Sequence, residues 1–220
     1  MSKLRLLFVK EAQASYISHL DLIRTFQRAF PRTELEIKHT QGYHPHPIMS
    51  IVLPLPVGQS SDCELLDFEV TQESDGAGIA ETLNTGMPLG LRVLECYAAS
   101  RPIRELTDLR ADVELEYDGG VPAGGVDALR QLFARDSLVI EKRTKRKDLA
   151  EVDIAPMIHS AILTEADGII RADVTVQAQN PGLNPQLLGK AIERYLPELT
   201  PDFIRVRRKA ILDAEGRDFR

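Results

Sequence analysis

Hydrophobic and polar residues follow two different periods along the first hundred residues. A period of two is typical of strands, and a period of 3.6 is typical of helices. The strand pattern covers residues 4–9, 35–39, 48–54, 65–70 and 91–98. Pro54 and Pro56 cannot donate to a strand ladder, so we expect the segment at 48–54 to be an edge strand or an interrupted one. The helix pattern covers residues 18–30 and 78–85.

The first predicted helix has sequence signals at both ends. Ser18 and Asp21 have the spacing of a capping box, in which the serine oxygen accepts from an amide three residues on and the acidic side chain reaches back. Pro31 ends the helix, because the residue before a proline avoids the helical conformation. The inner face is predicted from residues at helical spacing, which are Leu20, Ile23, Phe26, Gln27 and Phe30.

With the interrupted segment at 48–54 set aside in favour of the better strand at 65–70, the predicted elements of the first half have the order β-α-β-β-α-β, which is that of a ferredoxin-like unit. The same order returns after a polar, proline-marked segment at 101–108. Strand patterns there cover 109–117, 138–144, 168–178 and 203–212, and helix patterns cover 125–135 and 184–196. We therefore predict an α+β protein of two tandem ferredoxin-like units with antiparallel sheets, at residues 1–100 and 109–220.

Composition indicates the cellular compartment of the protein more clearly than its function. The 220 residues carry a formal net charge of -6, so binding to nucleic acid must come from a local patch. Cys63 and Cys96 form no CxxC pair, which is typical of a reducing compartment. No apolar run approaches the roughly 18 residues of a membrane span. We expect a cytoplasmic protein with no cofactor and no membrane partner.

Four of the five histidines fall within fewer than thirty residues, and three of them lie in an irregular connection at 39–58 that is rich in proline. Pro45 and Pro47 stiffen this connection, so we expect His44 and His46 to be presented in a set direction.

Three interpretations of these histidines are open. A metal ion could bind His44 and His46, which project to one side of an extended segment, with His19 or Asp21 as third ligand. Alternatively, His44 or His46 could act as a general acid or base. In the third interpretation, the histidines and Tyr43 are hydrogen-bonded parts of a rigid loop. We favour the third and predict no metal site, because a separated pair of histidines is weak evidence for a metal ion. Tyr16, Ser18, His19 and Asp21 could also supply a nucleophile and a base, but capping already accounts for Ser18 and Asp21.

Basic residues gather at two places in the second half. If the strands that carry them are neighbours, they form a positive face that can grip RNA or another phosphate-bearing target. The alternatives are solvated charge runs or the protection of an edge strand against aggregation. The predicted phosphate contacts are Lys142, Arg143, Lys145, Arg146, Lys147, Arg205 and Arg207.

Three blocks in the first half resemble a known family. They are Tyr16-Ile-Ser-His-Leu-Asp-Leu-Ile-Arg24, Gln41-Gly-Tyr-His-Pro-His-Pro47 and Leu53-Pro-Leu-Pro-Val-Gly58. In their order and spacing, the chain resembles the radical-SAM-linked protein family, a domain of unknown function fused to, or encoded beside, cobalamin-binding radical SAM proteins. A looser match covers residues 147–156. His46 departs from the family pattern, in which arginine is frequent at this position.

The resemblance implies a partner rather than a reaction. It implies an accessory or substrate-presenting module that acts with a radical SAM enzyme on RNA or a translation-related target, and no catalytic residue comes with it. The chain also lacks the CxxxCxxC triplet of a radical SAM enzyme. We therefore expect no catalytic activity of the chain alone; the alternative is a metal-dependent or acid-base RNA-processing enzyme that uses His19, His44 and His46. The predicted binding residues come from the first two blocks and are Tyr16, Ser18, His19, Asp21, Arg24, Gln41, Tyr43, His44 and His46.

Overall fold

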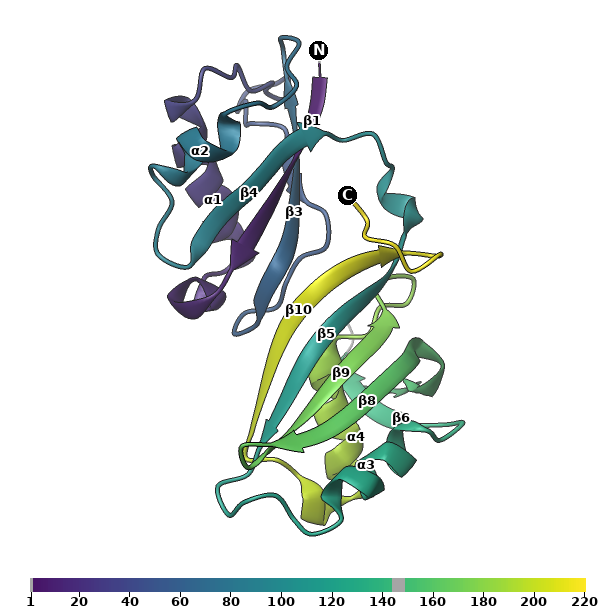
Figure 1. Ribbon diagram of the computed structural model, residues 1–220. Coiled ribbons are helices and arrows are strands. Elements are labelled where there is room, and N and C mark those ends of the chain that lie inside the picture. The colour runs from purple at the N-terminus through teal and green to yellow at the C-terminus, as the bar shows by residue number, and fades with distance from the viewer. Residues whose placement is uncertain (1, 144–148) are drawn as a thin grey trace. The chain divides into compact units, whose positions relative to one another are not determined.

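The computed structural model in Figure 1 describes residues 2–143 and 149–220. The chain divides into two compact units. Unit 1 consists of Met1–Glu105 and Asp218–Arg220, and unit 2 consists of Leu106–Arg217. The division lies inside the proline-marked segment at 101–108, but the last three residues return to unit 1, which the sequence pattern did not predict.

Unit 1 contains an antiparallel sheet in the order β4-β1-β3-β2. Its strands are β1 (Ser2–Lys10), β2 (Met49–Ile51), β3 (Ser60–Val70) and β4 (Leu91–Ala98). Helices α1 (His19–Ala29) and α2 (Ile79–Asn84) lie on one face of this sheet (Figure 1). Short 3-10 helices are η1 (Ala12–Tyr16), η2 (Phe30–Arg32) and η3 (Ile103–Glu105).

The core of unit 1 forms where alternate residues of the strands meet the apolar face of α1. Leu4, Leu6 and Phe8 of β1 are fully buried in it. The Phe26 ring of α1 stands edge-on to the Phe8 ring, with 5.0 Å between the centroids. Phe30 in turn contacts Phe68 of β3 at 4.7 Å between ring centroids. Aromatic contacts therefore join the helix to two neighbouring strands.

The predicted cap of α1 is confirmed. The Asp21 amide donates to Ser18 Oγ at 3.2 Å, and the Ser18 hydroxyl donates to the Asp21 carboxylate at 2.7 Å. The hydrogen bond from Ser18, followed by the one from Arg24, lowers the pKa of Asp21 below its ordinary value.

Replacing Ser18 by alanine is expected to destabilise the protein by about 1 kcal/mol, because the Asp21 amide then loses its acceptor. The same change should raise the pKa of Asp21 toward its ordinary value, since its largest stabilising contact is removed. Urea denaturation measures the first effect, and NMR titration of the Asp21 carboxyl measures the second. Ser18→Thr keeps the oxygen and is the control; an unchanged pKa of Asp21 in Ser18→Ala would contradict the capping geometry.

Two predictions for unit 1 were wrong in detail. Leu20 was expected on the inner face of the first helix, but its side chain is exposed and Leu22 is buried instead. The segment at 35–39 makes isolated bridges at Ile37 and His39 rather than a strand. In both places, packing within unit 1 determines which residues are buried or paired, and the local periodicity does not.

Unit 2 contains four antiparallel strands in the order β10-β5-β9-β8. Its strands are β5 (Leu106–Glu116), β8 (Ile158–Ala166), β9 (Ile169–Gln177) and β10 (Phe203–Asp213). Helices α3 (Gly125–Phe133) and α4 (Leu188–Tyr195) cover one face (Figure 1). Strands β6 (Val139–Arg143) and β7 (Leu149–Asp153) form a separate two-stranded sheet. The 3-10 helices are η4 (Ala155–Met157), η5 (Pro185–Leu187) and η6 (Pro197–Leu199).

Strand β8 was missed by the sequence pattern, and β6 does not join the main sheet. In β8, Leu163 is buried but its neighbour Ile162 is exposed, so the strand lacks a regular apolar face. The β6–β7 sheet instead lies beside α4, because the Tyr195 hydroxyl accepts from the Val139 amide at 3.0 Å and donates to the Val139 carbonyl at 3.2 Å.

The N-cap predicted at Asn184 is present at the start of the η5–α4 segment. Asn184 caps it by accepting from the Gln186 amide at 3.1 Å, although the first turn is 3-10 and the α-helix begins only at Leu188. Gly189 lets α4 approach β10 closely, because a Cβ atom there would lie 2.2 Å from Ile204 Cδ1. No helix within residues 2–143 and 149–220 has the length and apolar character to cross a membrane.

Candidate interaction surface

Three large apolar side chains of unit 1 are exposed within one small region. Tyr16 ends η1 and is 67% exposed, and Leu20 in the first turn of α1 is 64% exposed. Val57 is 57% exposed and directly precedes Gly58, whose amide donates to the Ser15 carbonyl at 2.8 Å. We call Tyr16, Leu20 and Val57 the docking surface. Its residues come from the first and third blocks of the family resemblance, which are far apart in the sequence.

Buried polar contacts support this surface from below. The Lys10 ammonium group is almost fully buried and donates to the Ser15 carbonyl at 3.0 Å. The hydroxyls of Ser15 and Ser60 are hydrogen-bonded at 3.0 Å. These bonds connect η1 to β1 and to the start of β3. The apolar side chains are therefore carried by a backbone that is tied at several points rather than by a free loop.

The second block forms the tip of a hairpin. The Thr40 amide donates to the His46 carbonyl at 2.9 Å, and the His46 amide donates to Thr40 Oγ1 at 3.2 Å. Nδ1 of His46 also lies 3.1 Å from Thr40 Oγ1. Between these positions, the Tyr43 side chain is fully exposed, and Gln41 and His44 are exposed as well. The hydrogen bonds of His46 are those expected of a rigid loop, but the fully exposed Tyr43 side chain is not held in the way this interpretation expected.

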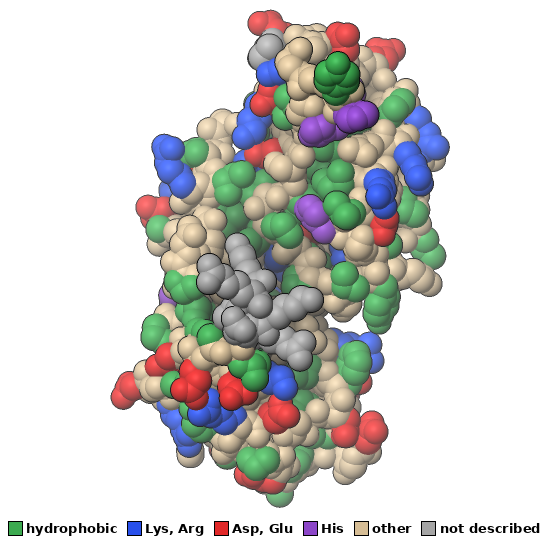
Figure 2. Space-filling model, turned by 180° about the vertical axis from the view of Figure 1, so that it is seen from behind, with side chains coloured by type: hydrophobic (Ala, Val, Ile, Leu, Met, Phe, Trp, Pro, Cys, Tyr) green, Lys and Arg blue, Asp and Glu red, His purple; other side chains and the backbone are tan. Residues whose placement is uncertain are grey.

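The structure does not bring His19 to the hairpin. The start of α1 follows Ser15, which bonds to Ser60 at the first residue of β3. The hairpin begins beyond Lys38, whose amide donates to the Glu69 carbonyl near the last residue of β3. Ser60 and Glu69 are nine residues apart along β3, which is roughly 30 Å at 3.3 Å per residue. In Figure 2, two histidine side chains lie next to each other and a third lies apart from them.

This separation removes His19 and Asp21 from the ligand set of the metal interpretation, and His19 from the alternative enzyme site with His44 and His46. His19 and Asp21 lie at the other end of β3 and cannot be the third ligand beside His44 and His46. Among the described residues, no group of three or more histidine, cysteine or acidic side chains is placed to hold a metal ion. Asp21 has a different role, because it accepts from Ser18 and pairs with Arg24 at 3.1 Å.

The arginines of β10 lie in a ladder of mixed charge. Arg205 forms an ion pair with Glu116, and Arg207 lies opposite Asp112 in the β10–β5 register. On the neighbouring strands, Arg110 Nε donates to Asp173 at 2.8 Å, and this bond lowers the pKa of Asp173. Acidic side chains thus alternate with basic ones along this face, so the arginines alone do not make it positive.

Of the other predicted phosphate contacts, Lys142 is the one whose side chain the structure describes. Lys142 is exposed in β6. The side chain of Arg143 and the whole of Lys145, Arg146 and Lys147 lie outside the described residues. Sequence patterns gave no signal for Lys190 and Arg194, which α4 carries beside Lys142 along one hollow.

Taken together, these features define an α+β protein of antiparallel sheets with exposed apolar and aromatic side chains on a hydrogen-bonded frame. The chain belongs to a family described as an uncharacterized protein conserved in bacteria (DUF2344), whose profile matches residues 3–185.

Comparison with solved structures adds information on the fold only. A chain in the crystal structure of a Cbf5-Nop10-Gar1 complex matches with a TM-score of 0.50 and 10% sequence identity, over 93% of this chain and 47% of that one. This chain therefore spans about half the length of that relative. An unknown protein from Galdieria sulphuraria matches at 14% identity over 94% of this chain and 98% of the other. Its TM-score of 0.28 is too low to indicate a shared fold. No curated protein matches.

Proposed function

We propose that the chain is an accessory or substrate-presenting module that acts with a radical SAM enzyme and presents RNA or another phosphate-bearing target to it. In this proposal unit 1 binds the enzyme, and unit 2 holds the target beside its basic residues. The radical SAM partner comes from the sequence resemblance of the three blocks. Each unit is proposed to be a ferredoxin-like module, with the β6–β7 sheet as an insertion in the second one.

The observation that carries this proposal is the docking surface. Exposed large apolar side chains that lie close together are typical of interaction sites in soluble proteins. Tyr16, Leu20 and Val57 are such a group, and the bonds of Ser15 to Lys10, Gly58 and Ser60 hold their backbone in place. A surface that is already ordered loses little conformational entropy on binding, which favours recognition over an incidental exposure of apolar groups.

Replacing Tyr16, Leu20 and Val57 together by serine is expected to weaken binding to the proposed radical SAM partner by at least about tenfold. Buried aromatic and aliphatic side chains supply much of the binding energy at protein interfaces, and serine removes that contribution. The measurement is the dissociation constant of the two purified full-length proteins, by surface plasmon resonance.

A matched control is Ile162→Ser, because Ile162 is 65% exposed but lies on β8 in unit 2. It should leave the affinity unchanged. Circular dichroism must show that the triple variant is folded. Equal binding of the triple variant and the original protein would refute the docking surface, and the absence of any binding between the original proteins would refute the partner.

A further inference from the structure

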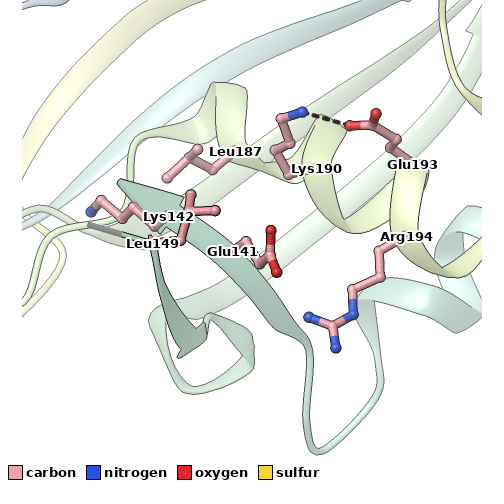
Figure 3. A pocket seen from close by; sticks show the side chains of 7 residues that line it. All are labelled: Glu141, Lys142, Leu149, Leu187, Lys190, Glu193 and Arg194. Carbon is pink, nitrogen blue, oxygen red and sulfur yellow. Dashed lines mark hydrogen bonds and ion pairs between the residues drawn. The ribbon is translucent and has the colours of Figure 1, made fainter. Parts of the chain in front are cut away.

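Unit 2 carries a hollow of about 630 Å³ between the β6–β7 sheet and the η5–α4 segment. This volume is within the usual range of small-molecule sites. Figure 3 shows the side chains that line it, which are Glu141, Lys142, Leu149, Leu187, Lys190, Glu193 and Arg194. It is open to solvent on one side, so a ligand could enter without a rearrangement of the fold.

The lining groups are ordered by chemistry. Leu149 of β7 and Leu187 of η5 lie close together at one end, and Lys142 extends beyond them (Figure 3). Arg194 lies toward the other end, whereas the Lys190 ammonium group is turned away from Arg194 and toward Glu193 (Figure 3). The Glu141 carboxylate, which only accepts hydrogen bonds when ionised, points into the space between the leucines and Arg194. From one end to the other, the hollow thus offers two leucines, the Glu141 acceptor and the Arg194 cation, while Lys142, Lys190 and Glu193 lie at its border.

We propose that this hollow binds a nucleoside monophosphate, either free or as one unit of a single-stranded RNA. The three parts of such a ligand match the order of the lining groups. The flat base fits the Leu149–Leu187 end, the ribose hydroxyls donate to Glu141, and the phosphate reaches Arg194. A guanidinium group can bind two phosphate oxygens at once, whereas an ammonium group acts as a point charge. This site is distinct from the docking surface, because its residues belong to unit 2 and those of the docking surface belong to unit 1.

The existing ion pair of Arg194 does not prevent phosphate binding. Arg194 pairs with Glu151 at 3.0 Å, and both side chains are largely exposed. Ion pairs between exposed side chains contribute little to stability, so a doubly charged phosphate can replace the Glu151 carboxylate at small cost.

The test titrates the purified full-length protein with each of the four nucleoside 5′-monophosphates and follows the amide signals by NMR. We expect saturable shifts at Leu149, Leu187 and Arg194. Adenosine and inorganic phosphate should each bind at least about tenfold more weakly than AMP, because each supplies only part of the contacts. A short single-stranded RNA serves as a second probe: tighter binding than AMP indicates the polymer as the source, and equal or weaker binding indicates the free nucleotide.

Two variants locate the site. Arg194→Ala is expected to weaken AMP binding about tenfold or more through the phosphate, and Leu187→Ser should weaken both AMP and adenosine through the base. Arg171→Ala is the matched control, since Arg171 is a similarly exposed arginine on β9 away from the hollow. The proposal is overturned if no nucleotide binds at millimolar concentration, if inorganic phosphate binds as well as AMP, or if both variants bind AMP normally. None of these outcomes depends on the radical SAM partner, so the two proposals fail separately.

Discussion

Replacing Asp67 by alanine is expected to destabilise the protein by about 3–5 kcal/mol, because the Arg5 guanidinium group is left buried without its counter-ion. Arg5 is 0% exposed in the middle of β1. Its Nε donates to Asp67 Oδ1 at 2.6 Å, and its Nη2 donates to Oδ2 at 3.0 Å. Urea denaturation followed by circular dichroism measures the loss as a lower midpoint at an unchanged slope.

Two further variants separate the buried pair from surface charge. Lys3 also contacts Asp67, at 3.1 Å, but it is half-exposed, so Lys3→Ala should cost less than about 1 kcal/mol. The double variant Arg5→Met, Asp67→Leu should recover most of the stability, since an apolar pair of similar volume removes the need to bury charge. A cost below about 1 kcal/mol for Asp67→Ala would show that the pair is solvated rather than buried.

Replacing Phe26 by alanine is the second change with a large expected effect, again about 3–5 kcal/mol. Phe26 is fully buried and its ring contacts Phe8 at 5.0 Å and Phe30 at 6.4 Å between centroids. Alanine leaves a cavity at the centre of these contacts and removes the edge-to-face pair with Phe8. Urea denaturation gives the stability.

The Phe26 variant also tests the link between the core and the proposed function. Phe26 holds α1 against the sheet, and α1 carries Leu20 of the docking surface, so Phe26→Ala should weaken binding to the radical SAM protein as well. Phe203→Ala is the control, because Phe203 is half-exposed on β10 and contacts Arg205 in solvent; its cost should stay below about 1 kcal/mol. Equal stability losses in the two variants would contradict the packing described for α1.

The elements with strong local signals were predictable from the sequence. The cap at Ser18 and the cap at Asn184 depend on groups only two or three residues away, and both are present. The alternation of β9 was correct as well, because Ile170, Ala172 and Val174 all lie on the buried face against the helices. A pattern with a regular period needs no knowledge of the neighbour to assign the buried side.

Elements without such signals were missed or misplaced. The exposed position of Leu20 follows from the way the helix axis lies on the sheet, and helical spacing alone fits more than one inward face. The edge strand β8 has a weak pattern, because only Leu163 of its central residues is buried. Its strand character comes from pairing with β9, which the sequence of β8 does not encode by itself.

The candidate sites were also predictable from the sequence only in part. The sequence by itself determined which residues are chemically unusual, namely the histidines, Tyr43 and the basic residues around Lys142. Only the tertiary structure decided which of them meet, because β3 holds His19 and His46 at opposite ends and Gly58 brings Val57 beside Ser15. Neighbours along the chain are set by covalent bonds, but neighbours in space are set by strand register and helix packing, which depend on the whole unit.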